Sequence, residues 1–143
     1  MLSQHMLQGY EAKYPDMDAD AVDDAFRLLR RGSQLMRELK AFYALHGMSS
    51  TQFMTMIVVD CQPERSGVVP SELAVDLDVT RPVASITIDA LVRRGLLTSI
   101  CSKDSRFKRV SLSPRGRVEL ANKLPDYFAL IANFMTSKSP DYL

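Results

Sequence analysis

The feature that most constrains the fold is an abrupt change of period after Gly95. Before this glycine, apolar residues recur every three or four positions, which is typical of amphipathic helices. After it, residues 97–101 and 109–112 are rich in β-forming side chains and flank a polar tip, so they predict a hairpin. A helix that ends directly before a hairpin restricts the chain to mainly helical folds with a small antiparallel sheet.

Two short helices are predicted directly before this hairpin. Pro70 suits a first helical position and opens a helix over residues 71–77, and a tight break follows at 78–79. Thr80 suits the N-cap of a second helix over residues 81–94, whose expected buried stripe is Ala84, Ile88 and Leu91. Two helices joined by a turn of three or four residues form a helix-turn-helix, and a hairpin directly after it forms a wing.

Longer helices are predicted on both sides of this region. Apolar spacing predicts helices over 18–45 and 50–60, with Ser49 or Ser50 as the N-cap of the second, after a lead-in over 1–17 that is a short helix or an arm. A final helix begins at Ser113-Pro114, and Pro125 should bend or split it. Its apolar stripe includes either Tyr127 or Phe128.

The apolar stripes of the first long helix and the last helix are wider than one small winged-helix core can cover. We therefore expect a homodimer, with Ile131 and Phe134 as buried anchors. The predicted organisation is an N-terminal arm and dimerisation helix over 1–48, a winged helix-turn-helix domain over 49–112, and C-terminal dimerisation helices over 113–143.

The formal net charge of +1 hides an uneven distribution. Residues 71–117 contain nine basic and five acidic side chains, whereas the segments before and after them are net acidic. A basic block inside an otherwise acidic chain is typical of a protein with a polyanionic partner such as double-stranded DNA, although solvated basic faces are also common.

Residues 71–116 resemble the MarR family of winged-helix transcription regulators. The elements that carry the resemblance are Leu91 with Arg94-Gly95-Leu96, the pair Asp104-x-Arg106 in the hairpin, and Val110-x-Leu112-Ser113-x-x-Gly116. With the flanking helices, the resemblance covers roughly residues 28–134. It implies a mainly α fold with a small β-hairpin wing, and a sequence-specific DNA-binding regulator, a repressor that responds to a small aromatic ligand.

The resemblance also implies which residues contact DNA. The wing arginine, Arg106, would enter the minor groove, Asp104 would fix the shape of the wing, and basic wing residues would contact phosphates. The expected DNA-binding residues are Thr80, Arg81, Pro82, Ser85, Ile86, Lys103, Asp104, Arg106 and Lys108.

The presumed recognition helix departs from the family pattern. Pro82 and Val83 stand where the family usually has small hydroxylated residues, and Ile86 stands where a basic or polar residue is common. Arg81 is then the only basic residue in the first three turns. Base-specific hydrogen bonding should be sparse and rest on Arg81 and Ser85, while Val83 and Ile86 can touch thymine methyl groups.

A second candidate site is an apolar crevice that could take the aromatic ligand. Methionine adapts to varied apolar shapes, and a Met-rich segment lies close in sequence to aromatic residues. The expected ligand-binding residues are Tyr43, His46, Phe53 and Met54. Ordinary core packing is the competing interpretation of the same residues.

No catalytic or metal-binding pattern is visible in the sequence. The chain has two histidines and no HExxH, GxSxG, Walker or GxGxxG motif, so we expect no enzyme activity, no metal and no cofactor. Cys61 and Cys101 lack CxxC spacing, and we interpret both as small buried apolar residues. Two alternatives stay open: a cysteine-based redox-sensing regulator, and a winged-helix module that binds proteins without binding DNA.

The longest aliphatic run, residues 56–59, is far shorter than the roughly 20 residues of a membrane-spanning helix. The N-terminal segment has no basic region followed by an apolar stretch, so it does not resemble a secretory signal. We therefore expect a cytoplasmic protein without a membrane partner.

Overall fold

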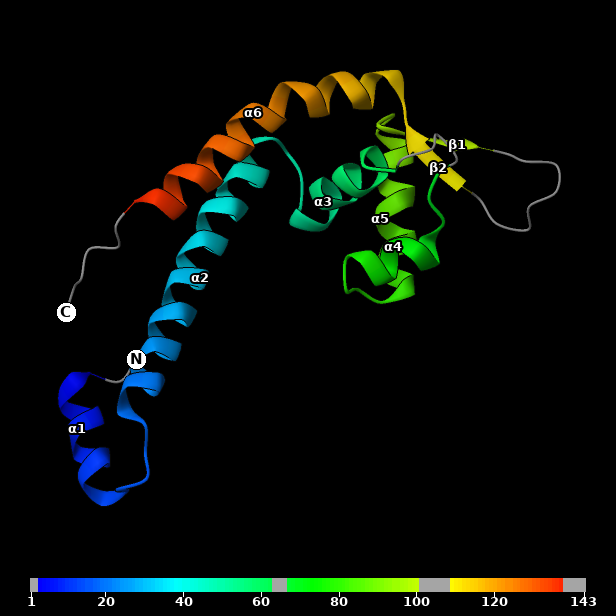
Figure 1. Ribbon diagram of the computed structural model, residues 1–143. Coiled ribbons are helices and arrows are strands. Elements are labelled where there is room, and N and C mark those ends of the chain that lie inside the picture. Colours follow the sequence, from blue (N-terminus) through cyan, green and yellow to red (C-terminus); the bar gives the residue numbers. More distant parts are fainter. Residues whose placement is uncertain (1–2, 63–66, 101–108, 138–143) are drawn as a thin grey trace. The chain divides into compact units, whose positions relative to one another are not determined.

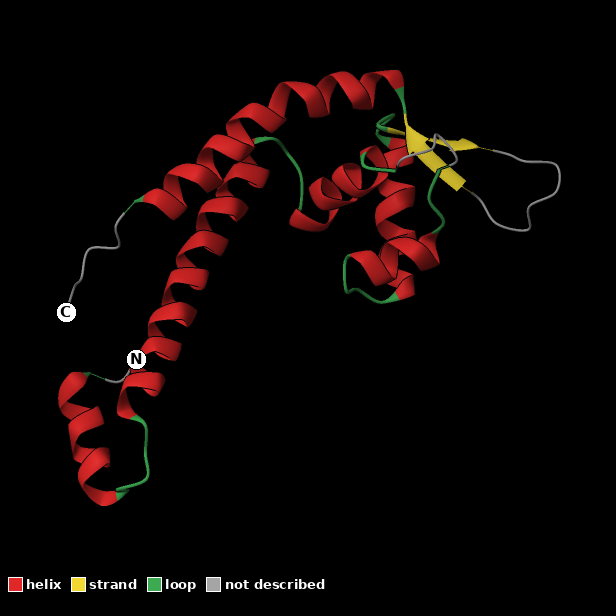
Figure 2. Ribbon diagram, in the orientation of Figure 1, coloured by secondary structure: helices red, strands yellow, loops and turns green. Residues whose placement is uncertain are grey.

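The computed structural model describes residues 3–62, 67–100 and 109–137, which contain six helices and a two-stranded sheet (Figures 1 and 2). In chain order the elements are α1 (Gln4–Lys13), α2 (Ala19–Leu45), α3 (Ser50–Asp60), α4 (Pro70–Asp76), α5 (Arg81–Arg93), β1 (Leu97–Ile100), β2 (Arg109–Leu112) and α6 (Pro114–Thr136). The predicted fold class, mainly α with a small β-hairpin, is confirmed.

The chain divides into two compact units. Residues 42–129 form one unit, and the segments before and after them form the other. The first of these units contains α3, α4, α5 and the hairpin, together with the last turn of α2 and the larger part of α6.

Side-chain caps fix where several helices begin. The Ser49 side chain accepts a hydrogen bond from the Gln52 N–H (3.1 Å), and the Gln52 side chain accepts one from the Ser49 N–H (3.2 Å), so Ser49 rather than Ser50 caps α3. Thr80 caps α5 by accepting from the Val83 N–H (3.4 Å). Both caps satisfy backbone donors that have no partner inside the helix.

Three helices end in the same way, at a residue whose backbone lies in the left-handed region of φ/ψ space and turns the chain away from the helix axis. Gly47 (φ 67°), Asp78 (φ 52°) and Gly95 (φ 75°) follow α2, α4 and α5. In each case the N–H of this residue donates a hydrogen bond to the carbonyl oxygen three residues earlier. The N–H of the next residue donates to the carbonyl oxygen five residues before it, which is the Schellman arrangement. The two glycines adopt this conformation without a Cβ penalty, and aspartate is among the few other residues that visit it.

The hairpin and three helices surround the core of the 42–129 unit. β1 pairs antiparallel with β2, with Leu97 opposite Leu112, and Val68 forms a single bridge to Val110. α3 packs against α5 and β2, and α4 packs against α5. The largest fully buried side chains here are Phe53, Met56, Leu73, Leu91, Leu96 and Leu120. This packing holds α5 with one face inside and one face outside.

Of the two outcomes expected for Pro125, a bend or a split of the last helix, the split is excluded, because α6 runs unbroken through this residue. Proline removes one backbone donor, and the carbonyl that loses its partner belongs to Ala121. Both residues are exposed, so water can reach this carbonyl. Of the two residues left open for the apolar stripe, Tyr127 is buried and Phe128 is exposed.

The other unit joins the outer parts of α2 and α6. The Arg31 guanidinium donates hydrogen bonds to the carbonyl oxygens of Phe134 (2.9 Å), Met135 (3.3 Å) and Ser137 (3.2 Å), and lies 5.0 Å from the Phe134 ring centroid. These carbonyls lie at the end of α6, where helix carbonyls have no partner inside the helix. Arg31 therefore caps α6 from α2.

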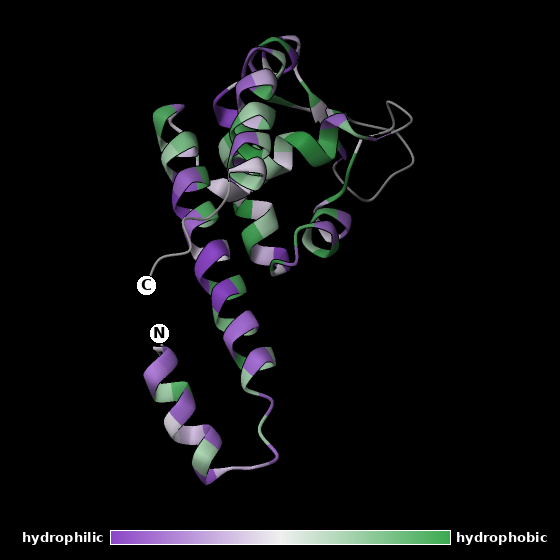
Figure 3. Ribbon diagram, turned by 60° about the vertical axis from the view of Figure 1, so that its left-hand side comes forward, coloured by the Kyte–Doolittle hydropathy of each residue, from purple (hydrophilic) through white to green (hydrophobic). Residues whose placement is uncertain are grey.

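Large apolar side chains are nevertheless exposed in this unit. Leu28 is 72% and Leu29 is 66% exposed on α2, and Met36 and Met135 are about half exposed or more. Hydrophobic and hydrophilic residues alternate along the length of α2 (Figure 3). Among the described helices, none combines the length and the apolar character that a membrane span requires.

Candidate nucleic-acid interface

Helix α5 has a buried face and an exposed face. Ala84, Thr87, Ile88 and Leu91 are buried, so the predicted stripe of Ala84, Ile88 and Leu91 faces the core. The exposed residues are Arg81, Pro82, Val83, Ile86, Asp89 and Arg93. The exposed face is open to a partner along the full length of the helix.

The predicted recognition residues lie together at the start of α5. Thr80, Arg81, Pro82 and Ile86 are exposed and Ser85 is half-buried. Thr80 uses its hydroxyl oxygen as the N-cap acceptor. Arg81 carries the only positive charge in the first three turns of α5. The four predicted wing residues, Lys103, Asp104, Arg106 and Lys108, lie outside the described residues.

The base of the hairpin holds one of the basic residues of the central block. Arg109 is half-buried, and its guanidinium donates a hydrogen bond to the Gly67 carbonyl oxygen (3.3 Å). The Val68 N–H and carbonyl pair with Val110 in the same place (2.9 and 3.0 Å). The chain just before α4 is therefore tied to β2.

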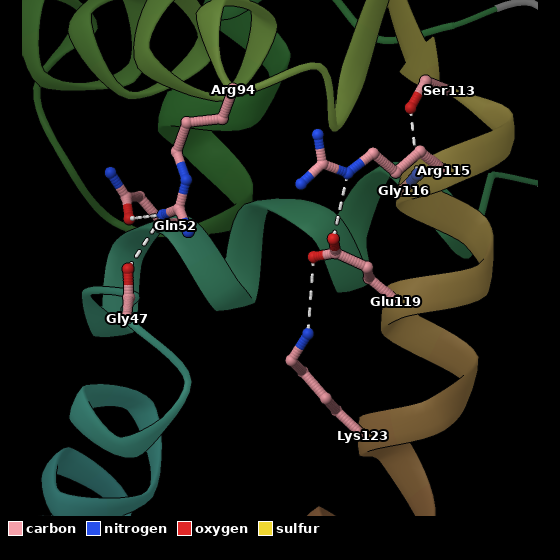
Figure 4. A network of polar contacts seen from close by, with 8 residues as sticks. All are labelled: Gly47, Gln52, Arg94, Ser113, Arg115, Gly116, Glu119 and Lys123. Carbon is pink, nitrogen blue, oxygen red and sulfur yellow. Dashed lines mark hydrogen bonds and ion pairs between the residues drawn. The ribbon is translucent and has the colours of Figure 1, made fainter.

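Residues of the Arg94-Gly95-Leu96 and Ser113-x-x-Gly116 motifs meet where α5 ends and α6 begins. Figure 4 shows the hydrogen bond between Ser113 and Gly116. The Ser113 hydroxyl donates to the Gly95 carbonyl (2.5 Å) and accepts from the Gly116 N–H (2.9 Å). The Ser113 N–H donates to the Leu96 carbonyl (3.0 Å). A Cβ on Gly116 would collide with the Leu96 carbonyl oxygen and lie 3.0 Å from its carbon. These residues fix the hairpin to α5 and α6 by internal contacts.

Arg94 connects the end of α5 to the turn between α2 and α3. Its guanidinium donates to the Gly47 carbonyl oxygen (2.9 Å) and to Gln52 Oε1 (3.2 Å) (Figure 4). Gln52 is also the residue that completes the cap of α3. In the sequence Arg94 stands out only as part of a motif, because its partner Gln52 lies 42 residues earlier and gives no local signal.

A charged network follows on the first turns of α6. Glu119 accepts hydrogen bonds from Arg115 (3.1 Å) and Lys123 (3.4 Å), each one helical turn away (Figure 4). Burial alone would raise the pKa of Glu119, but the hydrogen bonds and positive charges of Arg115 and Lys123 outweigh it, so this pKa lies below its ordinary value of 4.5. Both cations are thus partly neutralised by a neighbour on their own helix.

No protein-family model matches the sequence, and no curated protein matches it. Solved structures do match the fold. A MarR-family transcriptional regulator from Rhodococcus sp. RHA1 superimposes with a TM-score of 0.71 at 18% identity, covering 87% of this chain and 86% of that one. The chain has the fold of MarR-family regulators.

Two further matches are complexes with DNA. The Mycobacterium tuberculosis regulator MOSR in complex with DNA has a TM-score of 0.61 at 24% identity, covering 82% of this chain and 84% of that one. A Staphylococcus aureus MepR variant bound to an oligodeoxyribonucleotide has a TM-score of 0.62 at 17% identity, covering 84% and 85%. In the MarR-type fold of this chain, α4 and α5 form the helix-turn-helix, and β1 and β2 form the base of the wing.

The predicted ligand residues of this MarR-type fold belong to one aromatic cluster. The Phe53 ring lies 5.2 Å from the Tyr43 ring and 5.0 Å from the Tyr127 ring, and Phe42 lies 4.6 Å from the His46 ring. Tyr127 donates a hydrogen bond to the Met54 sulfur (3.7 Å). Burial, followed by the hydrogen bond with Tyr127, raises the pKa of Tyr43 far above its ordinary value. Tyr43 and Phe53 are buried, whereas His46 and Met54 are half-buried.

The expectation that Cys61 is buried is wrong. Cys61 is an exposed, free cysteine that follows directly after α3, where its backbone N–H closes the helix on the Ile57 carbonyl. Its position after the last turn of α3 leaves it exposed, although the helix body is apolar. Cys101 lies outside the described residues. Among the described residues, no group of three His, Cys, Asp or Glu side chains could hold a metal ion.

Proposed function

We propose that this protein is a sequence-specific DNA-binding transcriptional regulator that acts as a homodimer in the cytoplasm and catalyses no reaction. α5 enters the major groove, and the wing reaches the adjacent minor groove. The observation that carries the proposal is the start of α5, where Arg81, Pro82, Val83 and Ile86 are exposed while the opposite face is buried in the core. The DNA complexes among the proteins of the same fold support it.

The homodimer is supported by the exposed apolar side chains of α2 and by Met135 of α6. An exposed apolar patch of this kind usually marks an interface. The functional regions are then the arm and dimerisation helix (1–48), the DNA-binding domain (49–112) and the C-terminal dimerisation helices (113–143). Sedimentation at micromolar concentration should give a dimer, and a stable species of 16.1 kDa contradicts this part of the proposal.

DNA binding is tested with the full chain and a pool of random duplexes. After several rounds of selection, the enriched duplex and a scrambled duplex are titrated at two salt concentrations. If each subunit neutralises about four phosphates, the log–log salt slope is near −7 for the dimer. Absence of any enriched duplex, together with a flat salt dependence, rejects DNA binding and favours a module that binds other proteins.

Three variants separate the roles of the basic residues. Arg81→Ala should relax discrimination at one base pair by about 1–3 kcal/mol if its guanidinium contacts guanine. Arg106→Ala should weaken binding most where the minor groove is narrow and rich in A·T pairs. Lys108→Ala should weaken binding to all sequences alike and reduce the salt slope. The control is Arg27→Ala, which removes one positive charge that is paired with Asp23 on α2.

The regulator is further proposed to be a repressor released by a small aromatic carboxylate or phenol. Its binding residues are Tyr43, His46, Phe53 and Met54, of which the half-buried His46 and Met54 offer the entry. Such a ligand releases DNA only if it binds the DNA-free conformation better. Benzoate and phenol should raise the melting temperature and weaken DNA binding, and Met54→Ala should change both effects. Expression of a reporter gene placed downstream of the selected duplex should rise when the protein is removed.

A further inference from the structure

Apart from Arg81 at the first position, the exposed residues of the first two turns of α5 are apolar. Ile86 is 66% and Val83 is 41% exposed, and they lie three residues apart, so they are neighbours on one helix face. Pro82, four residues before Ile86, is exposed on the same side. The next residue on this face is Asp89, one turn further along, which carries a negative charge. A helix that recognised DNA through hydrogen bonds would have polar side chains here.

Charge indicates that the partner of this face is DNA rather than an apolar protein surface. From residue 81 to residue 117 the chain carries nine basic and two acidic side chains, and the exposed Arg81 lies two residues before Val83 in the sequence. This excess of positive charge in the segment attracts a polyanion and disfavours a purely apolar partner. The apolar residues therefore meet a surface that is anionic at its edges and apolar at its centre.

The major groove of DNA offers one such surface. Its base edges present hydrogen-bond donors and acceptors, and thymine adds a C5-methyl group, which apolar side chains contact. The first residues of a recognition helix are the ones that reach base edges. Val83 and Ile86 lie at the third and sixth positions of α5, within this reach.

We infer that Val83 and Ile86 are specificity-determining residues that select DNA sites through the C5-methyl groups of thymine. This inference rests on the proposed function and names the chemistry by which the site is read. The wing supplies affinity, Arg81 reads one base pair by hydrogen bonding, and Ile86, the more exposed of the two apolar residues, makes the larger methyl contact. Removing the methyl groups from the DNA should then cost affinity without any change of base pairing.

The size of this effect follows from the burial of a single methyl group. One buried CH₂ or CH₃ group changes binding by about fourfold. A two-fold dimer makes each contact twice, so loss of one methyl per half-site should weaken binding roughly 15-fold.

The experiment combines DNA lacking the methyl groups with protein lacking the side chains. The duplex enriched from the random pool is synthesised with thymine, and again with uracil at single thymine positions of both half-sites, since uracil differs only by the C5-methyl group. Both duplexes are titrated with the wild-type chain, Ile86→Ala, Val83→Ala and the control Val118→Ala. Val118 is 60% exposed on α6, so this control removes a matched aliphatic group away from α5. Thermal melting checks that each variant is folded.

The expected result is a roughly 15-fold preference of the wild type and of Val118→Ala for thymine at one or more positions. This preference should fall towards one in Ile86→Ala, because the variant lacks the side chain that contacts the methyl group. Equal wild-type affinity for the thymine and uracil duplexes overturns the inference and leaves DNA binding intact. If the preference for thymine survives in both Ile86→Ala and Val83→Ala, it arises from DNA shape and not from these side chains. This result also overturns the inference. If no duplex is enriched, the proposed function itself fails.

Discussion

Replacing Gly116 by alanine should destabilise the protein, although alanine is the better helix former. Gly116 lies in the first turn of α6, buried under the Leu96 backbone. A Cβ at this position would collide with the Leu96 carbonyl oxygen and approach the Leu96 Cα to 3.3 Å. These atoms are backbone, so the contact cannot be relieved by a side-chain rotation. The start of α6 and the turn after α5 must separate.

The magnitude follows from three terms. Alanine in place of glycine inside a helix gains about 1 kcal/mol. Overpacking of a buried site costs about 1–3 kcal/mol. Separation also strains the hydrogen bonds from the Ser113 N–H to Leu96 and from the Ser113 hydroxyl to Gly95, each worth about 1 kcal/mol. The net expectation is a loss of about 2–3 kcal/mol in the free energy of unfolding, set by the overpacking and hydrogen-bond terms.

The assay is urea unfolding at a fixed protomer concentration, because dimerisation would make stability depend on concentration. With a slope near 2 kcal/mol per molar urea, the midpoint should fall by about 1–1.5 M. The matched control is Gly9→Ala in the interior of α1, where a Cβ would meet nothing within 4 Å. This control should raise stability by up to about 1 kcal/mol. A Gly116→Ala midpoint at or above that of the wild type would show that α6 does not hold Leu96 this closely.

Three further substitutions test other contacts. Arg94→Ala should cost about 1 kcal/mol in urea unfolding, because it removes hydrogen bonds to Gly47 and Gln52, whereas Arg93→Ala, which loses one long contact with its own helix, should cost less. Asp78→Gly should raise the melting temperature, since Asp78 has φ 52° and glycine relieves about 1 kcal/mol of strain; an unchanged value contradicts this. Glu119→Gln should lower stability near neutral pH and lose its effect in acid. The reason is that a carboxylate with a lowered pKa stabilises the fold above its ordinary pKa of 4.5, and this contribution disappears as the pH falls through the lowered pKa. A loss that persists in acid would contradict the ion-pair account.

Local sequence signals were enough to predict the order of elements and most helix ends. Thr80 and Ser49 cap helices through hydrogen bonds that reach only three residues along the chain. Gly95 ends α5 because the required conformation is one that glycine adopts freely. Such signals depend on nearest neighbours in the chain, so the sequence carries them in full.

Features that depend on distant residues could not be predicted in the same way. Both Tyr127 and Phe128 fit the apolar stripe of α6, and Tyr127 is the buried one because its ring packs against Phe53, which is distant in the sequence. Cys61 was expected inside because cysteine is usually buried, but its place directly after α3 exposes it. A proline splits a helix where the hydrogen bond that it removes cannot be replaced. Pro125 and Ala121 are exposed, so water can bond to the Ala121 carbonyl in place of the missing N–H.

The motif residues and the departures from the family pattern have different places in the structure. Among the residues that carry the resemblance, five make their contacts within the protein, where they join α5 to the turn before α3, to the hairpin and to α6: Arg94, Gly95, Leu96, Ser113 and Gly116. Pro82, Val83 and Ile86 carry the departures, and all three are exposed on α5. Residues that make internal contacts report on the fold, which explains how the fold is shared at 16–24% identity. Exposed residues of α5 are free to differ without loss of the fold, so the proposed selection of DNA sites by this protein rests on Val83 and Ile86 themselves.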